Sequence, residues 1–365
     1  MKIALITIHN ANNYGAILQA YATQQAFSKY GKTIILDYDN RHLASSFNLI
    51  RCSLSIHGLK MLMHDVLRLP SRVRTLRNYK KYIADNLMLS QRLTSESLKE
   101  LDASKYDYFV SGSDQIWNPD IVSGISEVDG NYFLDFVSDK EKKISYASSK
   151  GAYSYSSQQA KNVVKKLAEY KKISVRESDA KAWIEENMEV AVEHVLDPTL
   201  LLTAEEWGGA GGEKEEPYIL LYSVPRSPLI KAAVDYYAEK LSMRVVSIDQ
   251  NLMPFGKVDV KVSDAGPSEY IKLFKNADYV ITDSFHGVCF SLIFSKVFFA
   301  IHSGGKANRM ESLLSLVGLS KRILKSANQF CMADLAIDYG PVREKISYQR
   351  EQSLEFIRSS LGIKE

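Results

Sequence analysis

The sequence contains few cysteines and no long apolar run. Only 3 cysteines occur in 365 residues, and the spacing of Cys52, Cys289 and Cys331 fits neither a CxxC pair nor a zinc ribbon. This usage predicts a reducing compartment. No run of about 18 consecutive apolar residues occurs, so no membrane-spanning helix is expected. The apolar start of the chain breaks at His9 and is too short for a signal peptide, so the sequence predicts a soluble, cytoplasmic protein.

The sequence also lacks a strong charge of either sign. Its 46 Lys and Arg residues and 43 Asp and Glu residues leave a formal net charge of +3. A dedicated nucleic-acid binder would be far more basic, so no nucleic-acid partner is expected. Hydrophobic residues make up 45% and charged residues 24% of the chain, which is typical of a globular protein. A chain of 365 residues is too long for one ordinary core, so two domains are predicted.

No nucleotide-binding motif follows the first predicted strand. Residues 2–8 form an apolar run suited to a buried strand, and residues 16–29 favour a helix. The loop between them has neither GxGxxG nor a Walker lysine, so it gives no support for dinucleotide or P-loop chemistry. Asn12, Asn13 and Gly15 tolerate the left-handed backbone of a loop that wraps a ligand, although a plain βα turn fits equally well.

Strand-helix alternation occurs twice, on either side of a stretch rich in glycine and charge. Residues 207–217 show no periodicity, which is typical of a linker. The alternation predicts two doubly wound, Rossmann-like α/β domains facing a cleft, in residues 1–206 and 218–340, with a last helix in residues 341–365. Beyond the opening strands at residues 2–8 and 33–39, the expected strands are residues 106–113, 143–147, 173–175, 218–224, 244–248, 258–262, 279–282 and 297–302.

One region, residues 51–92, is strongly basic. It holds nine basic and two acidic residues, and apolar residues recur in its first part at helical spacing. We predict an amphipathic helix, a break at Pro70 and a basic second helix, all inserted in the first domain. Such a face is usually just solvated. It could also dock on an anionic bilayer, at the inner face of the membrane, or collect an acceptor that carries a diphosphate.

Polar residues follow three of the predicted strands, where ligands bind in folds of this class. Asp114 follows a run of small residues that would allow close approach of a ligand. Arg176 ends another strand, and a buried arginine there needs either a salt bridge, with Glu177 for example, or an anion. His286 lies in a turn after residues 279–282, as a proton shuttle or as a structural turn residue. The later loop with Gly304, Gly305, Lys306 and Arg309 could hold a phosphate or carboxylate.

These motifs together resemble those of the polysaccharide pyruvyl transferase family. The matching pieces occur in the family's order and extend over residues 1 to about 320. Each piece alone is a weak signal, but the ordered set is fairly specific. The pieces are Asn13 to Tyr21 after the opening strand, Ser111 to Pro119, Val175 to Glu177, Leu196 to Thr199, and Thr282 to Gly287.

The resemblance implies a GT-B-like fold whose last helix packs back on the first domain. It also implies transfer of the enolpyruvyl carbons of phosphoenolpyruvate onto a sugar as a ketal, without a metal or another cofactor. His286 matches the family's catalytic histidine, and Arg176 matches an arginine that binds the donor. Family members often carry arginine two residues before the histidine, where this chain has Ser284; Arg309 or Lys306 would then have to supply that charge.

The chemistry of the residue types also fits this reaction, apart from the resemblance to the family. Phosphoenolpyruvate is a polyanion, so its site needs fixed cations and backbone donors. His286 could protonate the methylene carbon, while Asp114 or Asp283 orients it or accepts the proton of a sugar hydroxyl. The acceptor would be a hexose of a cell-surface polysaccharide or of its lipid-linked precursor. Its expected contacts are Asn12, Asn13, Tyr14, Gly15, Ser113, Gln115 and Trp117.

Two other functions share these features. A GT-B glycosyltransferase that uses a nucleotide sugar would have the same fold and the same glycine-rich loop. A noncatalytic sugar-binding relative would bind the acceptor without turnover, and Ser284 favours this alternative. A hydrolase triad of Asp283, Ser284 and His286 is disfavoured, because residues this close along one turn cannot converge as a triad requires. Cys289 is expected to be buried in a helix instead of acting as a nucleophile.

Overall fold

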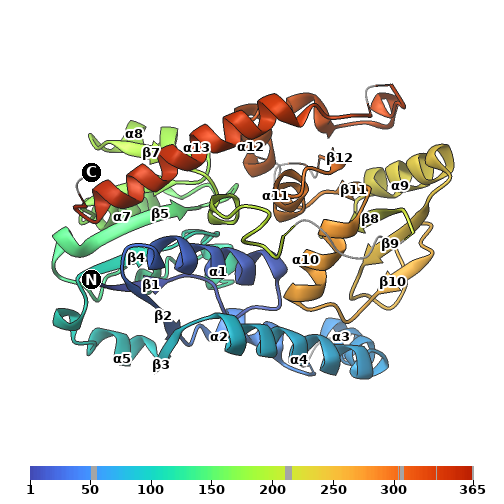
Figure 1. Cartoon of the computed structure of the whole chain (residues 1–365). Coiled ribbons are helices and arrows are strands. Elements are labelled where there is room, and N and C mark those ends of the chain that lie inside the picture. The colour runs from blue at the N-terminus through green and yellow to red at the C-terminus, as the bar shows by residue number, and fades with distance from the viewer. Residues whose placement is uncertain (51–55, 210–215, 303, 305–307, 334, 364–365) are drawn as a thin grey trace. The chain divides into compact units, whose positions relative to one another are not determined.

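The computed structural model describes residues 1–50, 56–209, 216–302, 304, 308–333 and 335–363. Its contacts divide the chain into two compact units. Unit 1 comprises Met1–Phe47, Ile83–Leu202 and Ile346–Glu365. Unit 2 comprises Asn48–Tyr82 and Thr203–Lys345. Each unit is therefore built from segments that are distant in the sequence (Figure 1).

Unit 1 contains a seven-stranded sheet in the order β3-β2-β1-β4-β5-β6-β7, and every neighbouring pair is parallel. The central strands are apolar and buried on both faces, as parallel strands covered by helices must be. The strand order reverses between β1 and β4, and ligands bind at the carboxyl ends of the strands at such a reversal in sheets of this class. The strands are β1 Lys2–Ile6, β2 Lys32–Tyr38, β3 Leu89–Leu93, β4 Tyr108–Ser111, β5 Lys143–Ser148, β6 Lys172–Val175 and β7 Val192–His194.

The helices of unit 1 connect these strands and pack on the sheet. Helix α1 begins where the Asn13 side chain accepts a hydrogen bond from the Ala16 N–H at 3.1 Å, and most of its residues are buried. The helices are α1 Tyr14–Ser28, α2 Arg41–Ala44, α5 Ser95–Lys99, α6 Pro119–Val122, α7 Ser157–Leu167 and α8 Ser178–Asn187.

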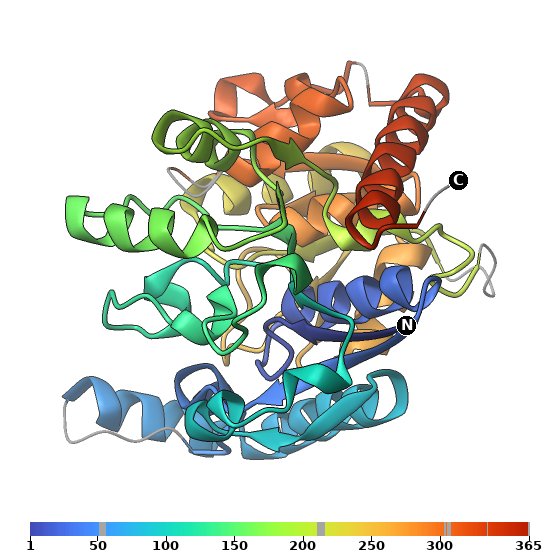
Figure 2. The same cartoon turned by 90° about the vertical axis from the view of Figure 1, so that its left-hand side faces the viewer.

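The last helix, α13 (Tyr339–Ser360), contributes its residues from Ile346 onward to unit 1 (red in Figure 1 and Figure 2). The Ser353 hydroxyl oxygen accepts from the Leu196 N–H at 3.0 Å. Arg350 Nε donates to the Leu200 carbonyl at 2.9 Å, and the Phe356 ring packs 6.3 Å from that of Tyr146. These contacts fix the C-terminal helix on the body of unit 1.

Unit 2 contains a six-stranded parallel sheet in the order β10-β9-β8-β11-β12-β13. The same reversal occurs here between β8 and β11. The predicted fold class, two doubly wound Rossmann-like α/β domains, is thus confirmed. The elements are β8 Tyr218–Tyr222, α9 Pro228–Leu241, β9 Arg244–Ile248, β10 Val260–Val262, α10 Pro267–Asn276, β11 Tyr279–Thr282, α11 Phe285–Ile293, β12 Val297–Ile301, α12 Asn308–Leu316 and β13 Ile323–Leu324.

The basic segment forms two consecutive helices, α3 (Ile56–Leu67) and α4 (Leu69–Asn86), and Pro70 lies in the first turn of α4. Residues 48–82 group with unit 2, whereas we expected an insertion in the first domain. The reason is a set of long-range hydrogen bonds. Thr75 Oγ1 donates to the Ser263 carbonyl at 3.2 Å, and Asn78 Nδ2 donates to the Asp264 carbonyl at 3.0 Å.

Candidate active site

In unit 2 the strand order reverses where β8 and β11 end side by side, and ligands of parallel α/β sheets bind at such positions. Asp283, the residue after β11, accepts a hydrogen bond from the Ser223 hydroxyl at 2.7 Å and from the Val224 N–H at 2.9 Å. The Thr282 hydroxyl donates to the Tyr222 carbonyl at 2.7 Å. Side chains that follow β11 therefore hold the loop after β8 in place.

Asp283 is only 4% exposed. Burial raises the pKa of its carboxyl above the ordinary aspartate value, and the hydrogen bonds from Ser223 and Val224 oppose this shift. Both carboxylate oxygens already accept hydrogen bonds from the neighbouring loop. Asp283 thus holds the loop after β8, and its raised pKa lets it keep a proton more readily than an exposed aspartate would.

His286 lies in the first turn of α11, which begins at Phe285. The Ser284 hydroxyl caps this helix by accepting from the Gly287 N–H at 3.4 Å. The imidazole ring lies 5.2 Å from the ring of Phe285 in an edge-to-face arrangement, and the residue is 7% exposed. The amino end of a helix carries partial positive charge, so an anion bound beside His286 would be stabilised there.

Gly287 allows α11 to approach β11 closely. A Cβ atom at this position would lie 2.3 Å from Thr282 Oγ1, which is too close for any real contact. We expect Gly287→Ala to lower the free energy of unfolding by about 1–3 kcal/mol, because the first turn of α11 must shift to relieve the overlap. Urea titration measures this loss.

The matched control is Gly340→Ala, which also lies in the first turn of a helix. There the nearest atom to an added methyl group is Asp338 Oδ1, a side-chain atom 3.2 Å away that can move aside. The Gly340→Ala change is expected to stay within about 0.5 kcal/mol of wild type. Equal stability of the Gly287→Ala protein and wild type would show that the close approach is not required.

Arg309 places a cation beside the His286 turn. Its guanidinium carbon lies 5.5 Å from the centre of the Phe285 ring, the residue next to His286. Gly304 is exposed, and its N–H donates to His302 Nδ1 at 3.2 Å. Gly305 and Lys306, the other residues predicted in this loop, lie outside the described residues. Arg309 is thus the predicted cation that the described structure brings to the turn of Ser284 and His286.

In unit 1 the strand order reverses between β1 and β4, and Asp114 follows β4. Its backbone has a φ of 72°, a conformation that is costly for a residue with a side chain and that often marks a functional site. Asp114 Oδ1 accepts from the Gln115 N–H at 2.8 Å. The Ser113 carbonyl accepts from the Thr7 hydroxyl at 2.8 Å, which ties the loop after β4 to the one after β1.

Arg176 lies at the end of β6, within a group of carboxylates. Its side chain is 1% exposed and lies 2.6 Å from Asp197 Oδ2, 3.5 Å from Glu177 Oε1 and 3.6 Å from Asp114 Oδ1. Burial alone would lower the pKa of the guanidinium, but Asp197, Glu177 and Asp114 outweigh it and raise that pKa. The structure thus shows the salt-bridged alternative, with Asp197 as the nearest partner instead of Glu177. The role of Arg176 as a ligand of the donor stays a prediction.

The residues predicted to contact the acceptor divide into two groups. Tyr14, Gly15, Ser113 and Trp117 are buried, and the Trp117 ring stacks on that of Phe133 at 5.4 Å. These four residues therefore belong to the interior of unit 1. Of the seven residues predicted to contact the acceptor, the other three are partly or fully exposed: Asn12, Asn13 and Gln115.

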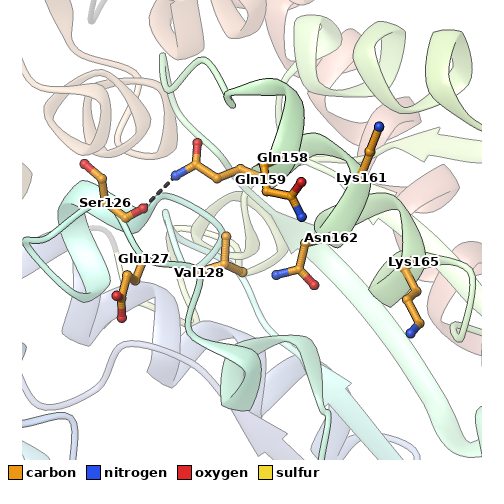
Figure 3. A pocket seen from close by; sticks show the side chains of 8 residues that line it. All are labelled: Ser126, Glu127, Val128, Gln158, Gln159, Lys161, Asn162 and Lys165. Atoms are coloured by element: carbon orange, nitrogen blue, oxygen red, sulfur yellow. Dashed lines mark hydrogen bonds between the residues drawn. The ribbon is translucent and has the colours of Figure 1, made fainter.

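Three surface grooves around residues 122–131 were not predicted. Two of them, of about 360 and 530 Å³, share Tyr38, Ser95, Ser123 and Asp129 as lining residues. The Tyr38 hydroxyl donates to Asp129 Oδ2 at 3.0 Å, and burial raises the pKa of Asp129. Figure 3 shows the third groove, of about 540 Å³, where Gln159 on α7 reaches the Ser126 carbonyl. Amides, carboxylates and hydroxyls of this kind can bind a polyhydroxylated ligand.

The described residues contain no group of three or more His, Cys, Asp or Glu side chains that could hold a metal ion. Cys289 is buried, as expected for a residue in a packed helix, and Cys331 is exposed. Cys52 lies outside the described residues.

The model for the family described as polysaccharide pyruvyl transferase matches residues 13–303 of the chain. No curated protein is significantly similar in sequence. Among solved structures, the chain resembles S. aureus MnaA bound to UDP, at 12% identity and a TM-score of 0.52, covering 100% of this chain and 97% of that chain.

Two other solved structures show a similar degree of likeness. A UDP-N-acetylglucosamine 2-epimerase has 9% identity and a TM-score of 0.50, covering 98% of this chain and 94% of that chain. An α-glucosyltransferase in complex with UDP and a 13-mer DNA has 7% identity and a TM-score of 0.51, covering 98% of this chain and 95% of that chain. At such low identity the likeness shows the fold alone, and it agrees with the GT-B-like class predicted from the sequence.

Proposed function

Because the chain belongs to the polysaccharide pyruvyl transferase family, we propose that it transfers the enolpyruvyl group of phosphoenolpyruvate onto a hexose as a ketal. The proposed acceptor is a cell-surface polysaccharide or its lipid-linked precursor. The observation that supports this most directly is the position of His286 in the first turn of α11, beside the cation Arg309. That arrangement offers a proton donor next to a place for an anion.

The reaction needs one proton on carbon and two new carbon–oxygen bonds. In the proposed sequence, protonated His286 donates its proton to the methylene carbon of phosphoenolpyruvate. A sugar hydroxyl attacks the adjacent carbon and gives up its proton, for which Asp114 is the proposed acceptor. A second hydroxyl of the same sugar then attacks that carbon, the bond to the phosphate oxygen breaks, and phosphate leaves with the remaining proton. No redox step occurs, and the proposal includes no cofactor besides the co-substrate.

We assign the donor site to the His286 turn and to the loop before α12. Arg309, Lys306, the Ser284 hydroxyl and the backbone of Gly304 and Gly305 would bind the phosphate and carboxylate groups. Arg176 is a weaker candidate for a direct contact, because a donor would have to compete with Asp197 for a guanidinium that is 1% exposed. We propose instead that Arg176 positions Asp114, which lies 3.6 Å away.

The test is incubation with phosphoenolpyruvate and a panel of nitrophenyl and lipid-linked hexosides, followed by measurement of released phosphate and of the product's mass. The expected result is phosphate release that depends on one class of hexoside, together with a product that carries a pyruvate ketal. Absence of phosphate release with every sugar, combined with no thermal stabilisation by phosphoenolpyruvate, would overturn the proposed donor.

A nucleotide-sugar glycosyltransferase is the second candidate. It is favoured by the UDP-bound proteins that share the fold. In that case UDP would raise the melting temperature and phosphoenolpyruvate would not. A noncatalytic sugar-binding protein is the third candidate, and it would be stabilised by a hexoside without releasing phosphate from any donor.

A further inference from the structure

Helix α3 presents an apolar surface to solvent. Met63, Val66 and Leu67 are 60%, 51% and 67% exposed. Their spacing of three and four residues places them on one face of the helix. A helix of a globular domain normally buries such a face against its core, whereas among residues 62–67 of α3 the buried position is Asp65. The exposed apolar face of α3 therefore has the character of a contact surface.

Helix α4 continues this surface with positive charge. Val73, Arg77, Lys80 and Lys81 are all exposed, and their spacing places them on one helical face. Asp85 is the exposed acid of this helix. The opposite face is buried through Arg72, Thr75, Leu76, Tyr79 and Tyr82.

The orientation of α4 within unit 2 is fixed. Arg74 Nε lies 2.5 Å from Asp264 Oδ2, and this ion pair adds to the hydrogen bonds that Thr75 and Asn78 make with residues 263 and 264. Arg72 Nε donates to the Leu49 carbonyl at 2.9 Å. The basic face of α4 is thus held outward by contacts on its other side.

We infer that residues 62–84 of α3 and α4 form a docking surface for an anionic bilayer. Met63, Val66 and Leu67 would enter the boundary between headgroups and acyl chains, and Arg77, Lys80 and Lys81 would lie against lipid phosphates. The proposed contact is peripheral, with both helices at the membrane surface. No helix in the described ranges is long and apolar enough to cross a membrane. This inference does not depend on the reaction proposed above.

A bilayer fits this surface better than two other partners do. Nucleic acid would pair with the basic residues but would leave the three apolar side chains of α3 exposed to water. A second copy of the chain, related by a two-fold axis through this face, would set Arg77, Lys80 and Lys81 against themselves. An anionic membrane offers both an apolar layer and negative charge.

The test is flotation of the full chain with vesicles of phosphatidylcholine alone or with about 30% phosphatidylglycerol. We expect the protein to float with the anionic vesicles only, and less so when salt rises from about 0.1 M to about 1 M. Lys80→Glu/Lys81→Glu and Met63→Ser/Leu67→Ser should each weaken the apparent vesicle affinity by at least about tenfold. Thermal melts of both variants check that each protein is folded.

The matched control is Lys161→Glu/Lys165→Glu on α7, which makes the same change in charge at exposed lysines. The apolar residues Val163 and Leu167 of α7 are buried, so this helix lacks the exposed apolar component. The control should float as wild type does. The inference would be overturned by equal loss in the control, by no flotation of the wild type, or by a dimer in light scattering that only Met63→Ser/Leu67→Ser dissociates.

Discussion

His286→Gln is expected to lower the turnover number by about 10²–10⁴-fold while leaving the fold intact. Glutamine keeps the polar character of the side chain, but it cannot donate a proton to carbon. His286 is 7% exposed in the first turn of α11, and glutamine, which is similar in size, fills much of the same space, so the change removes the proton donor with little loss of packing. The measurement is phosphate release at saturating phosphoenolpyruvate and acceptor, with urea unfolding as the check on stability.

His64→Gln provides the matched control, since it makes the same substitution in α3. That variant should turn over soluble acceptors at the wild-type rate. Full pyruvylation by His286→Gln would end the assignment of His286 as general acid, whereas equal loss in both variants would point to a general effect of the substitution. Thermal stabilisation by phosphoenolpyruvate should persist in His286→Gln, because the proposed donor contacts come from Arg309 in α12 and from the residues before that helix.

The central strands of both sheets could be predicted because each is an apolar run of the right length. The strands that were missed lie toward sheet edges. β3 (Leu89–Leu93) has three consecutive polar residues between its two leucines and is partly exposed, and β13 contains only Ile323 and Leu324. β7 (Val192–His194) has three residues. Short edge strands carry too little hydrophobic pattern to be separated from loops.

The sequence also placed the chemically important residues at strand ends, but it could not determine their partners. Arg176 pairs most closely with Asp197, 21 residues away, because β6 and β7 are neighbours in the sheet. The hydrogen bond from Thr75 to Ser263 joins residues 188 positions apart, and it is part of what places α4 in unit 2. Such contacts depend on the topology of the sheets, which local patterns do not encode.

Ser284 illustrates how the structure changes the meaning of a substitution. From the sequence alone, Ser284 means that the positive charge of the family's arginine is missing at this position. In the structure its hydroxyl caps α11, and Arg309 brings a guanidinium to the neighbouring Phe285 ring. A cation from the first turn of α12 could therefore compensate for the arginine that the family often carries at position 284. This compensation needs no change in the position of His286.

Arg176→Met is expected to lower the free energy of unfolding by about 3–5 kcal/mol, because it leaves the buried carboxylates of Asp197 and Glu177 without their cation. Arg358→Met is the matched control on α13. Arg358 also lies close to two carboxylates, at 2.5 Å from Glu351 and 2.8 Å from Glu355, but it is 25% exposed at the surface. Its loss should cost less than about 1 kcal/mol.

The double variant Arg176→Met/Asp197→Asn separates a structural role from donor binding. Asparagine can still accept from the Thr199 hydroxyl, as Asp197 does at 2.6 Å, while removing one unpaired charge. We expect the double variant to recover about 1–2 kcal/mol of the unfolding free energy that Arg176→Met loses. A double-mutant cycle measures this recovery as the coupling energy between the two residues. If Arg176 positions Asp114, the folded double variant keeps thermal stabilisation by phosphoenolpyruvate and loses turnover. Loss of that stabilisation would instead identify Arg176 as a ligand of the donor.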